Sequence, residues 1–466
     1  MASFRLWFAL IPCLLFAAAT LQAQEKKPNI VFILIDDLGY GDIGPFGSKL
    51  NRTPNLDRLA KEGMKLTSFY ACPVCTPSRA QIMTGCYAKR VSLPKVLFPV
   101  AATGLSGNEI TIARLLKNLG YITICIGKWH LGDQPAFLPT RHGFDQFFGL
   151  PYPNDMTPDK KAGPKKADPK KADPKKGKIP PLPLLRGEKV IETVSQDGQD
   201  DLTERYTVEA VQFIRDNKDR PFFLYLPHMA VHAPLHPGKA FRGKSKNGLY
   251  GDWVEETDAS VGRVMDVLRE LKLDKNTLVI FSSDNGASKN GSNAPFTGFK
   301  GSASEGGMRI PMIAWWPGKI GADTASDAVT GNIDLLPTLV KLAGGEAPKD
   351  RVIDGKDLWP LLSGTKKESP HDAYYCFGVN GLSAVRSGPW KLYLDGNALY
   401  QLDKDFSEKM NVAQANPEVV KKLQAFVERM DKDLGVTKIG PGVRAPGRVE
   451  NPQPLLLRDE PKQDQR

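Results

Sequence analysis

Apolar runs that stop at polar residues recur along most of the chain. The first extends from Asn29 to Ile35 and stops at Asp36 and Asp37. Runs of the same kind cover residues 121–126, 221–226, 277–282 and 309–316. Continuous apolar stretches of this length are typical of strands that are buried on both faces of a parallel sheet.

Segments with helical spacing of apolar residues lie between these runs. The longest covers residues 252–273, and shorter ones cover residues 53–63, 78–84 and 111–118. The alternation predicts an α/β fold with a large, mostly parallel central sheet flanked by helices. In such sheets, ligands bind beyond the carboxyl ends of the strands.

The pattern changes after about residue 365. Residues 382–386, 390–394 and 398–402 predict short strands, and residues 417–434 predict a helix. We therefore expect a main domain over residues 24–365, a small antiparallel sheet with one helix over residues 366–440, and a tail over residues 441–466.

The N-terminus has the pattern of an export signal. Arg5 precedes an apolar run from Leu6 to Ala19, and small residues follow up to Ala23. This predicts a signal peptide over residues 1–23 and export to a periplasmic, lysosome-like or extracellular location. The apolar run is too short for a stable membrane span, and no second span is predicted.

The net charge of +11 is concentrated in one segment. Residues 155–178 contain nine lysines and four aspartates in a KKADP-type repeat, which leaves +6 for the rest of the chain. Such a repeat cannot form a packed core, so we expect a solvated loop inserted in the main domain. No nucleic-acid-binding motif accompanies it, while a weak tether to acidic glycan or membrane stays open.

Oxygen-donor side chains follow two of the predicted strands. Asp36 and Asp37 come after the first, and Asp284 and Asn285 follow residues 277–282. Such donors, without a set of cysteine and histidine ligands, select calcium or magnesium over zinc. These residues can also simply turn the chain, but their occurrence at two strand ends favours a metal site.

Basic side chains follow two other predicted strands. Lys128 and His130 come after residues 121–126, and His228 and His232 come after residues 221–226. A lone histidine is more often a hydrogen-bonded structural residue, but histidines at strand ends are also candidates for acid–base catalysis.

Cys75 begins the stretch Cys-Thr-Pro-Ser-Arg. Proline suits the first turn of a helix, so Cys75 is expected at a helix N-terminus, with Arg79 one turn further on. A reactive group facing an anion pocket is one interpretation. A redox pair with Cys72, half a zinc site and a plain buried cysteine are the alternatives. Five cysteines remain after residue 23, and this odd number indicates one with a special fate.

These stretches together resemble the type I sulfatases of the alkaline phosphatase superfamily, especially the arylsulfatase A-like branch. Residues 75–79 are similar to the Cys-x-Pro-Ser-Arg signature of that family, and residues 127–132 are similar to its second signature. Residues 29–41, 283–286 and 300–311 resemble further blocks. The lysine-rich repeat departs from the family pattern. This departure leaves the choice of substrate open and does not change the expected chemistry.

The resemblance implies that a formylglycine-generating maturation enzyme oxidises Cys75 to Cα-formylglycine. One hydroxyl of the hydrated aldehyde would attack sulfur, and the sulfo-enzyme would then expel sulfate as the aldehyde re-forms. A bound Ca²⁺, with Mg²⁺ as the lesser alternative, would acidify the hydrate. Its implied ligands are Asp36, Asp37, Cys75, Asp284 and Asn285.

The resemblance also implies roles for the basic residues. Arg79 and Lys128 would hold the charge of the hydrate and the sulfate, and His130 would be the base of the elimination step. His232 and Lys300 would bind the ester oxygen, and His232 would protonate the leaving group. The implied substrate is a sulfated carbohydrate or an aryl sulfate, and the residues expected to contact it are Lys128, His232, Lys300, Asn154, Asp155 and His228.

Two other functions fit the same residues. Relatives of this type can use formylglycine on phosphorus, so a phosphonate monoester or phosphodiester hydrolase is one alternative. An inactive glycan-binding protein, in which Cys75 stays unmodified, is the other.

Overall fold

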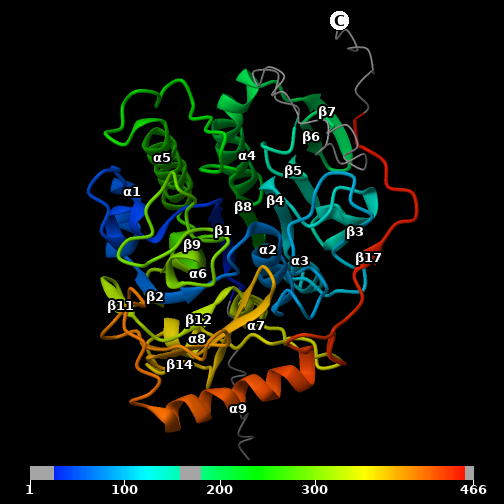
Figure 1. Ribbon diagram of the computed structural model, residues 1–466. Helices are drawn as coiled ribbons and strands as arrows, with labels where there is room; N and C mark the ends of the chain where they lie inside the picture. The colour runs from blue at the N-terminus through cyan, green and yellow to red at the C-terminus, as the bar shows by residue number, and fades with distance from the viewer. Residues whose placement is uncertain (1–25, 158–179, 457–466) are drawn as a thin grey trace, which may run out of the picture.

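The computed structural model describes residues 26–157 and 180–456 (Figure 1). Most of its strands form one sheet in the order β11-β2-β10-β9-β1-β8-β4-β5-β6-β7, with β12 paired to β2. The strands are β1 (Asn29–Ile35), β2 (Met64–Tyr70), β4 (Ile122–Lys128), β5 (Gln146–Leu150), β6 (Pro183–Arg186), β7 (Lys189–Thr193), β8 (Phe222–Pro227), β9 (Thr277–Ser283), β10 (Arg309–Trp315), β11 (Thr324–Ser326) and β12 (Thr330–Gly331). The predicted signal peptide and the KKADP repeat lie outside the described residues.

β1 lies at the centre of this sheet. It pairs in parallel with β8 on one side and with β9 on the other, and β4 and β5 extend the parallel pairing beyond β8. β10 is antiparallel to both β9 and β2, and β6 and β7 form an antiparallel edge. The prediction of a large, mostly parallel α/β sheet is confirmed.

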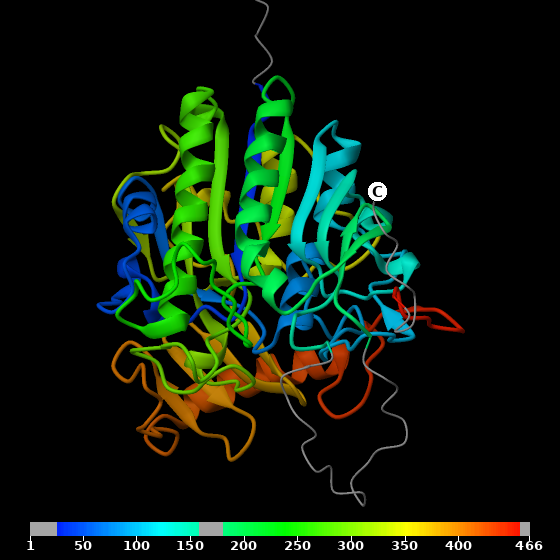
Figure 2. The same ribbon diagram turned by 90° about the horizontal axis from the view of Figure 1, so that it is seen from above.

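Helices cover both faces of the sheet. Phe32 and Leu34 of β1 pack in one core with residues of α2, α3 and α7, whereas Val31 and Ile33 pack in a second core with α1, α4 and α5. Figures 1 and 2 show α4 and α5 side by side on the second face. The helices are α1 (Pro54–Lys61), α2 (Cys75–Thr84), α3 (Ile112–Asn118), α4 (Leu202–Asp216), α5 (Gly248–Glu270), α6 (Glu305–Met308), α7 (Leu335–Leu342), α8 (Trp359–Leu362) and α9 (Pro417–Leu434).

A second, smaller sheet follows in the chain and packs with α9. Its antiparallel strands are β13 (Tyr374–Gly378), β14 (Gly381–Ser387), β15 (Trp390–Tyr393) and β16 (Leu399–Gln401). The predicted small sheet with one helix is confirmed, although β13 is an additional strand. A short pair, β3 (Thr103–Gly104) with β17 (Gly447–Arg448), joins the C-terminal segment to the main body. The domain division at residue 365 stays a prediction.

A buried ion network joins the small sheet to the large one. The carboxylate of Glu305 accepts a hydrogen bond from the Tyr70 hydroxyl (2.6 Å) and pairs with Nζ of Lys391 (2.9 Å) and Nη1 of Arg309 (3.2 Å). Burial alone would raise the pKa of Glu305, but Lys391, Arg386 and Arg309 together lower it to about 2. The network therefore holds an ionised carboxylate between the two sheets.

The apolar pattern does not predict β2, β5, β6, β7 or α4. β7 is an edge strand in which exposed and half-buried residues alternate, so it has no apolar run. β2 likewise alternates buried and half-buried residues over its first half. α5 begins at Gly248, four residues before its predicted start. Over residues 26–157 and 180–456, no helix has the length and apolar character needed to cross a bilayer.

Candidate active site

The ends of four parallel strands bring the predicted site residues together. Because β1, β4, β8 and β9 are parallel, their carboxyl ends lie at one edge of the sheet. The residues at or after these ends are Asp36, Asp37, Lys128, His130, His232, Asp284 and Asn285. Cys75 and Arg79 reach the same edge from the first turns of α2, as the contacts below show.

Cys75 is the first residue of α2 and is 2% exposed. Its Sγ lies 3.4 Å from Oδ1 of Asp36. Ser78 fixes the turn before the helix, because its hydroxyl donates to the carbonyl oxygen of Cys72 (3.0 Å) and accepts from the amide N–H of the same residue (2.9 Å). The predicted location of Cys75 at a helix N-terminus is confirmed.

The thiol of Cys75 is not poised as a thiolate. Burial raises its pKa, and Asp284 and Asp36 raise it further. Burial also raises the pKa of Cys72, and both residues are free thiols. A redox pair needs a cysteine with a lowered pKa, so the raised pKa values of these two buried thiols argue against that interpretation. Within the described ranges, the cluster of possible metal ligands around Cys75 does not include Cys72, which removes the zinc half-site.

Two buried cations neutralise two buried carboxylates at the site. Nζ of Lys128 donates to Oδ2 of Asp36, and Nη2 of Arg79 lies 2.9 Å from Oδ2 of Asp284 and 3.4 Å from Oδ2 of Asp36. Burial alone would raise the pKa of Asp36, but Lys128, His232 and Arg79 hold it below its usual range. Pairing of this kind is what allows charges to remain in a site without water.

Three side chains converge on Asp37. Nδ2 of Asn285 donates to its Oδ1 (2.7 Å), Nζ of Lys300 donates to its Oδ2 (2.9 Å), and Nε2 of His232 lies 3.9 Å from the same Oδ2. Asp37 has a φ of 61°, in the left-handed region, so the chain turns sharply directly after β1. The structure thus joins the residues after β1 and β9 with the predicted lysine of a distant loop.

The donors at this edge fit a divalent cation. One ligand atom each of Asp36, Asp37, Cys75 and His232 lies within 4.8 Å of the others. Oδ1 of Asn285 is buried and has no hydrogen-bond partner within the described part of the chain. Buried polar atoms are normally paired, so this free oxygen is available to an ion. Carboxylate and amide oxygens are the ligands that Ca²⁺ and Mg²⁺ prefer.

His130 presents one free ring nitrogen inside the site. Its Nε2 contacts the carbonyl oxygen of Leu97 (3.0 Å), while its buried Nδ1 has no partner among residues 26–157 and 180–456. Burial, together with Lys128 and Arg79, lowers the pKa of His130 well below its usual value. The imidazole is therefore neutral and able to accept a proton.

His228 is a core residue, which corrects its interpretation as a substrate contact. The side chain is fully buried, its Nε2 contacts Oγ of Ser260 (3.1 Å) and its ring packs near Tyr206. Burial lowers the pKa of His228 to about 3, as expected of a neutral histidine inside the second core. The histidine lies in the apolar interior because β8, which it follows, is covered there by α4 and α5.

Asn154 and Asp155 keep their substrate role as a prediction only. The amide of Asn154 is buried and donates to Oε1 of Gln199 (2.9 Å) and to the carbonyl oxygen of Pro234 (3.0 Å). It thus ties the loop after β5 to the loop after β8. Asp155 is exposed.

Thr76 is a supporting residue that sequence reasoning missed. Its hydroxyl donates to the carbonyl oxygen of His130 (3.0 Å) and accepts from the amide N–H of Leu97 (3.2 Å). It therefore links the start of α2 to the His130 backbone and to Leu97, whose carbonyl oxygen contacts the His130 ring. Only its position next to Cys75 could have indicated this role, because the partners are distant in sequence.

Comparison with known proteins finds relatives over most of the chain. Residues 28–345 match the family described as Sulfatase, and residues 300–433 match the description N-sulphoglucosamine sulphohydrolase, C-terminal. The chain is 40% identical to N-acetylgalactosamine-6-sulfatase of Mus musculus over 391 residues, which cover 79% of this chain and 72% of that protein. It is 38% identical to arylsulfatase A of Homo sapiens over 480 residues, which cover 93% of this chain and 94% of that protein.

Two solved structures are similar to this chain over most of its length. PsFucS1 sulfatase from Pseudoalteromonas sp. gives a TM-score of 0.79 at 28% identity and covers 89% of this chain and 92% of its own. Ps i-CgsB gives a TM-score of 0.75 at 32% identity and covers 87% of this chain and 93% of its own.

Proposed function

The chain belongs to the sulfatase family and hydrolyses sulfate esters, and we propose that it acts on sulfated carbohydrates through a formylglycine formed from Cys75. The observation that carries this proposal is the position of Cys75, buried at a helix N-terminus within 3.4 Å of a carboxylate oxygen of Asp36. A thiol with a raised pKa is a poor nucleophile in that position, whereas a diol there would lie next to acidic and basic partners.

A divalent cation, which we propose to be Ca²⁺, would be held by Asp36, Asp37, Asp284 and Asn285. When bound, it supplies Lewis-acid chemistry that lowers the pKa of a coordinated hydroxyl and polarises sulfate oxygens. The free Oδ1 of Asn285 and the hydrogen bond of its Nδ2 to Asp37 support this ligand set.

The buried cations provide the charge that a sulfate group requires. Arg79 and Lys128 already face the carboxylates next to Cys75, and Lys300 reaches the same edge through Asp37. We propose that they orient the sulfate group and stabilise the charge that develops on its oxygens, because preorganised donors act most strongly in a site that excludes water.

Two histidines are proposed to move protons. The imidazole of His130 is neutral, and its Nδ1 has no partner within the described residues. This nitrogen can therefore remove a proton from the second hydroxyl of the diol. Nε2 of His232 lies 3.9 Å from Oδ2 of Asp37, where it can donate a proton to the departing alcohol oxygen.

Relatives support a carbohydrate as the substrate. N-acetylgalactosamine-6-sulfatase is similar over most of both chains, and Ps i-CgsB has been solved in complex with k-i-k-neocarrahexaose. The signal-like residues 1–23 support export, and we propose that a separate formylglycine-generating enzyme matures Cys75 before the protein acts outside the cytoplasm.

The proposal is tested by measuring sulfate release from a panel of sulfated glycans, using protein coexpressed with a formylglycine-generating enzyme. The wild type should release sulfate from at least one glycan, and Cys75→Ala should lose at least about 10³-fold in rate, as expected when a nucleophile is removed. Mass spectrometry of the peptide that contains residue 75 gives an independent readout. Turnover by a wild type whose Cys75 is an intact thiol would refute the formylglycine mechanism.

A phosphodiesterase is the second candidate, because the same cations would bind a phosphate group. Turnover of 4-nitrophenyl sulfate compared with bis(4-nitrophenyl) phosphate discriminates the two. Faster hydrolysis of the phosphodiester would reverse the proposed preference. A protein that binds glycan but turns over neither compound would fit the glycan-binding alternative.

A further inference from the structure

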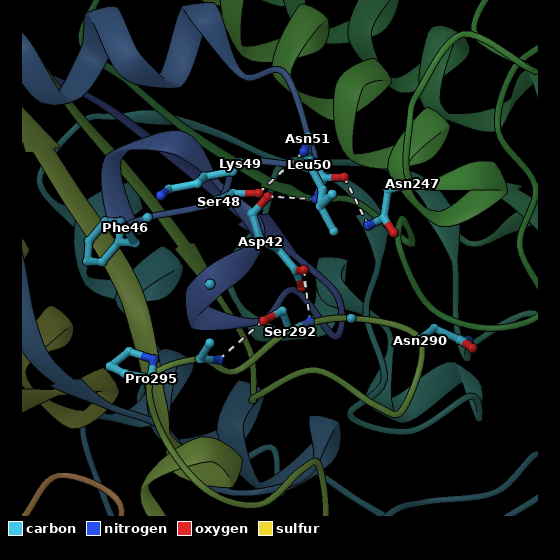
Figure 3. Close-up of a pocket in the computed structure, with 14 residues that line it drawn as sticks. Asp42, Phe46, Ser48, Lys49, Leu50, Asn51, Asn247, Asn290, Ser292 and Pro295 are labelled. Atoms are coloured by element: carbon cyan, nitrogen blue, oxygen red, sulfur yellow. Dashed lines mark hydrogen bonds between the residues drawn. The ribbon is translucent and has the colours of Figure 1, made fainter.

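A cavity of about 590 Å³ lies beside the residues just described (Figure 3). Its walls come from residues 41–51, which follow β1, from residues 290–295 in the loop after β9, and from Asn247 next to the start of α5. Ligand pockets measure about 300–1,000 Å³, so this cavity has room for a sugar residue. None of its residues has a role in the proposed chemistry.

The hydroxyl group of Tyr250 links the wall of the cavity to the metal-binding edge. The hydroxyl oxygen of Tyr250 lies 3.5 Å from the carbonyl oxygen of Asp37 and 2.5 Å from Oδ2 of Asp42, which lines the cavity. Lys300 and the cavity residues 290–295 also belong to one loop, between β9 and α6. The cavity is therefore next to the residues that follow β1 at the metal-binding edge.

Amide and hydroxyl side chains dominate one end of the cavity. Nδ2 of Asn247 donates to Oδ1 of Asn51 (3.0 Å), whereas the side chain of Asn290 makes no hydrogen bond within the described ranges. Ser48 and Ser292 add hydroxyls to the lining. Amides and hydroxyls both donate and accept hydrogen bonds, and so do the hydroxyl groups of a sugar ring.

A cation and an aromatic ring stand at the other end. Figure 3 shows Lys49 and Phe46 on the side of the cavity opposite to Asn247 and Asn290. Lys49 is exposed and has no ion pair with any residue that the structure describes. Phe46 packs edge-to-face against Tyr40, with 4.8 Å between ring centroids.

The carboxylate in the cavity wall does not neutralise Lys49. Oδ1 of Asp42 accepts from the amide N–H of Ser292 (2.9 Å), and its Oδ2 accepts from the amide N–H of Gly39 (2.8 Å) and from the Tyr250 hydroxyl (2.5 Å). Asp42 is thus occupied in joining the two loops that form the walls. An unpaired ammonium group remains available to an anionic ligand.

We propose that this cavity is a subsite that binds a second, sulfated sugar residue of an oligosaccharide substrate. Asn290 and Asn247 hydrogen-bond the hydroxyl groups of that residue, Phe46 packs against the ring, and Lys49 pairs with its sulfate. The subsite rests on the proposed action on sulfated carbohydrates and goes beyond it, because it makes the enzyme prefer oligosaccharides that carry more than one sulfate over single-ring substrates.

The test compares two substrates and three variants in the full-length, matured protein. The substrates are 4-nitrophenyl sulfate, which has one ring, and the disulfated oligosaccharide that the glycan panel identifies as the best substrate. Lys49→Ala and Asn290→Ala remove side chains that make no hydrogen bond or ion pair with any described residue, so we expect folding to be preserved. Lys289→Ala is the control, because Lys289 is exposed beside Asn290 and does not line the cavity.

Each cavity variant should raise the KM for the oligosaccharide about fivefold to tenfold, the effect of one lost ion pair or hydrogen bond, and leave the hydrolysis of 4-nitrophenyl sulfate unchanged. Lys49→Arg should keep most of the affinity for the oligosaccharide, and Lys289→Ala should leave the KM for both substrates unchanged. Three results would overturn the subsite. The cavity variants could change the KM for both substrates equally, or leave the KM for the oligosaccharide unchanged. The wild type could also turn over the aryl sulfate but no oligosaccharide. A wild type that releases sulfate from neither substrate would instead refute the proposed function.

Discussion

Replacing Glu305 by glutamine should destabilise the protein strongly, although the residue lies outside the proposed chemistry. Glutamine has the shape of glutamate but no charge, so it leaves Lys391 and Arg386 without their shared counter-ion. Lys391 is fully buried, and Arg386 lies 3.6 Å from the Glu305 carboxylate and is also buried. Lys391 keeps a carboxylate partner, Glu408, at 2.9 Å and a hydrogen bond to the carbonyl oxygen of Ala303, also at 2.9 Å.

Two arguments give the same magnitude for this change. Breaking a buried ion pair by removing one partner costs about 3–5 kcal/mol. Independently, the cations lower the pKa of Glu305 from 4.5 to about 2, which corresponds to about 3 kcal/mol of stability at neutral pH. Because the folded-state pKa is lowered, this stability is present above pH 4.5 and is lost as the pH falls towards 2.

The assay is urea denaturation of the wild type and of Glu305→Gln at pH 7 and at pH 3.5. The variant should lose about 3 kcal/mol at pH 7 and clearly less at pH 3.5, because the glutamate of the unfolded wild type is then mostly protonated whereas the folded one is still ionised. Glu209→Gln is the matched control, because its pair with Arg186 (2.6 Å) is at the surface and should contribute less than about 1 kcal/mol. A loss for Glu305→Gln no larger than that of the control, or a loss independent of pH, would refute the reasoning.

Three further changes test other parts of the structure. Both ring nitrogens of the buried His142 lack partners within the described residues, and burial and Arg114 lower its pKa to about 3. Below pH 6.5 the histidine of the unfolded chain binds a proton and the folded one does not, so the free energy of unfolding falls by about 1.4 kcal/mol per pH unit. His142→Phe should be more stable relative to wild type at pH 5 than at pH 7 in urea denaturation, and an equal difference at both would contradict this. Asn285→Ala should raise the Ca²⁺ concentration for half-maximal sulfate release at least about tenfold, whereas an unchanged requirement would exclude Asn285 as a ligand. Thr76→Val should lower kcat with little change in KM and cost about 1 kcal/mol in unfolding free energy; an unchanged kcat would show that the Thr76 hydroxyl does not position His130.

The strand-end pattern predicts much of the site because of one geometric rule. Apolar runs buried on both faces, such as β1 and β9, are visible in sequence, and parallel strands bring their carboxyl ends to one edge. The sequence alone therefore predicts one metal site formed by Asp36, Asp37, Asp284 and Asn285. Lys300 follows no strand directly, and only the family resemblance suggested it.

Other features depend on contacts that no local pattern encodes. The pairing of Glu305 with Lys391 joins residues 86 positions apart, and the support of His130 by Thr76 spans 54 positions. His228 shows the opposite error, because a histidine next to a strand end can point into the apolar core instead of the site. Edge strands such as β7 also escape detection, since half of their side chains face water.

The enclosure of Cys75 also sets an order of events during the synthesis of the protein. The side chain is 2% exposed once the sheet is complete, so the maturation enzyme that we propose could not reach it in the folded state. The buried site around it includes Asp284, whose partner Arg79 lies 205 positions earlier in the chain. As the chain emerges from its N-terminus, Cys75 is therefore accessible throughout the interval before Asp284 is added. Under the proposed mechanism, a molecule that finishes folding with its thiol intact stays inactive until it unfolds again, so folding and maturation of Cys75 would compete.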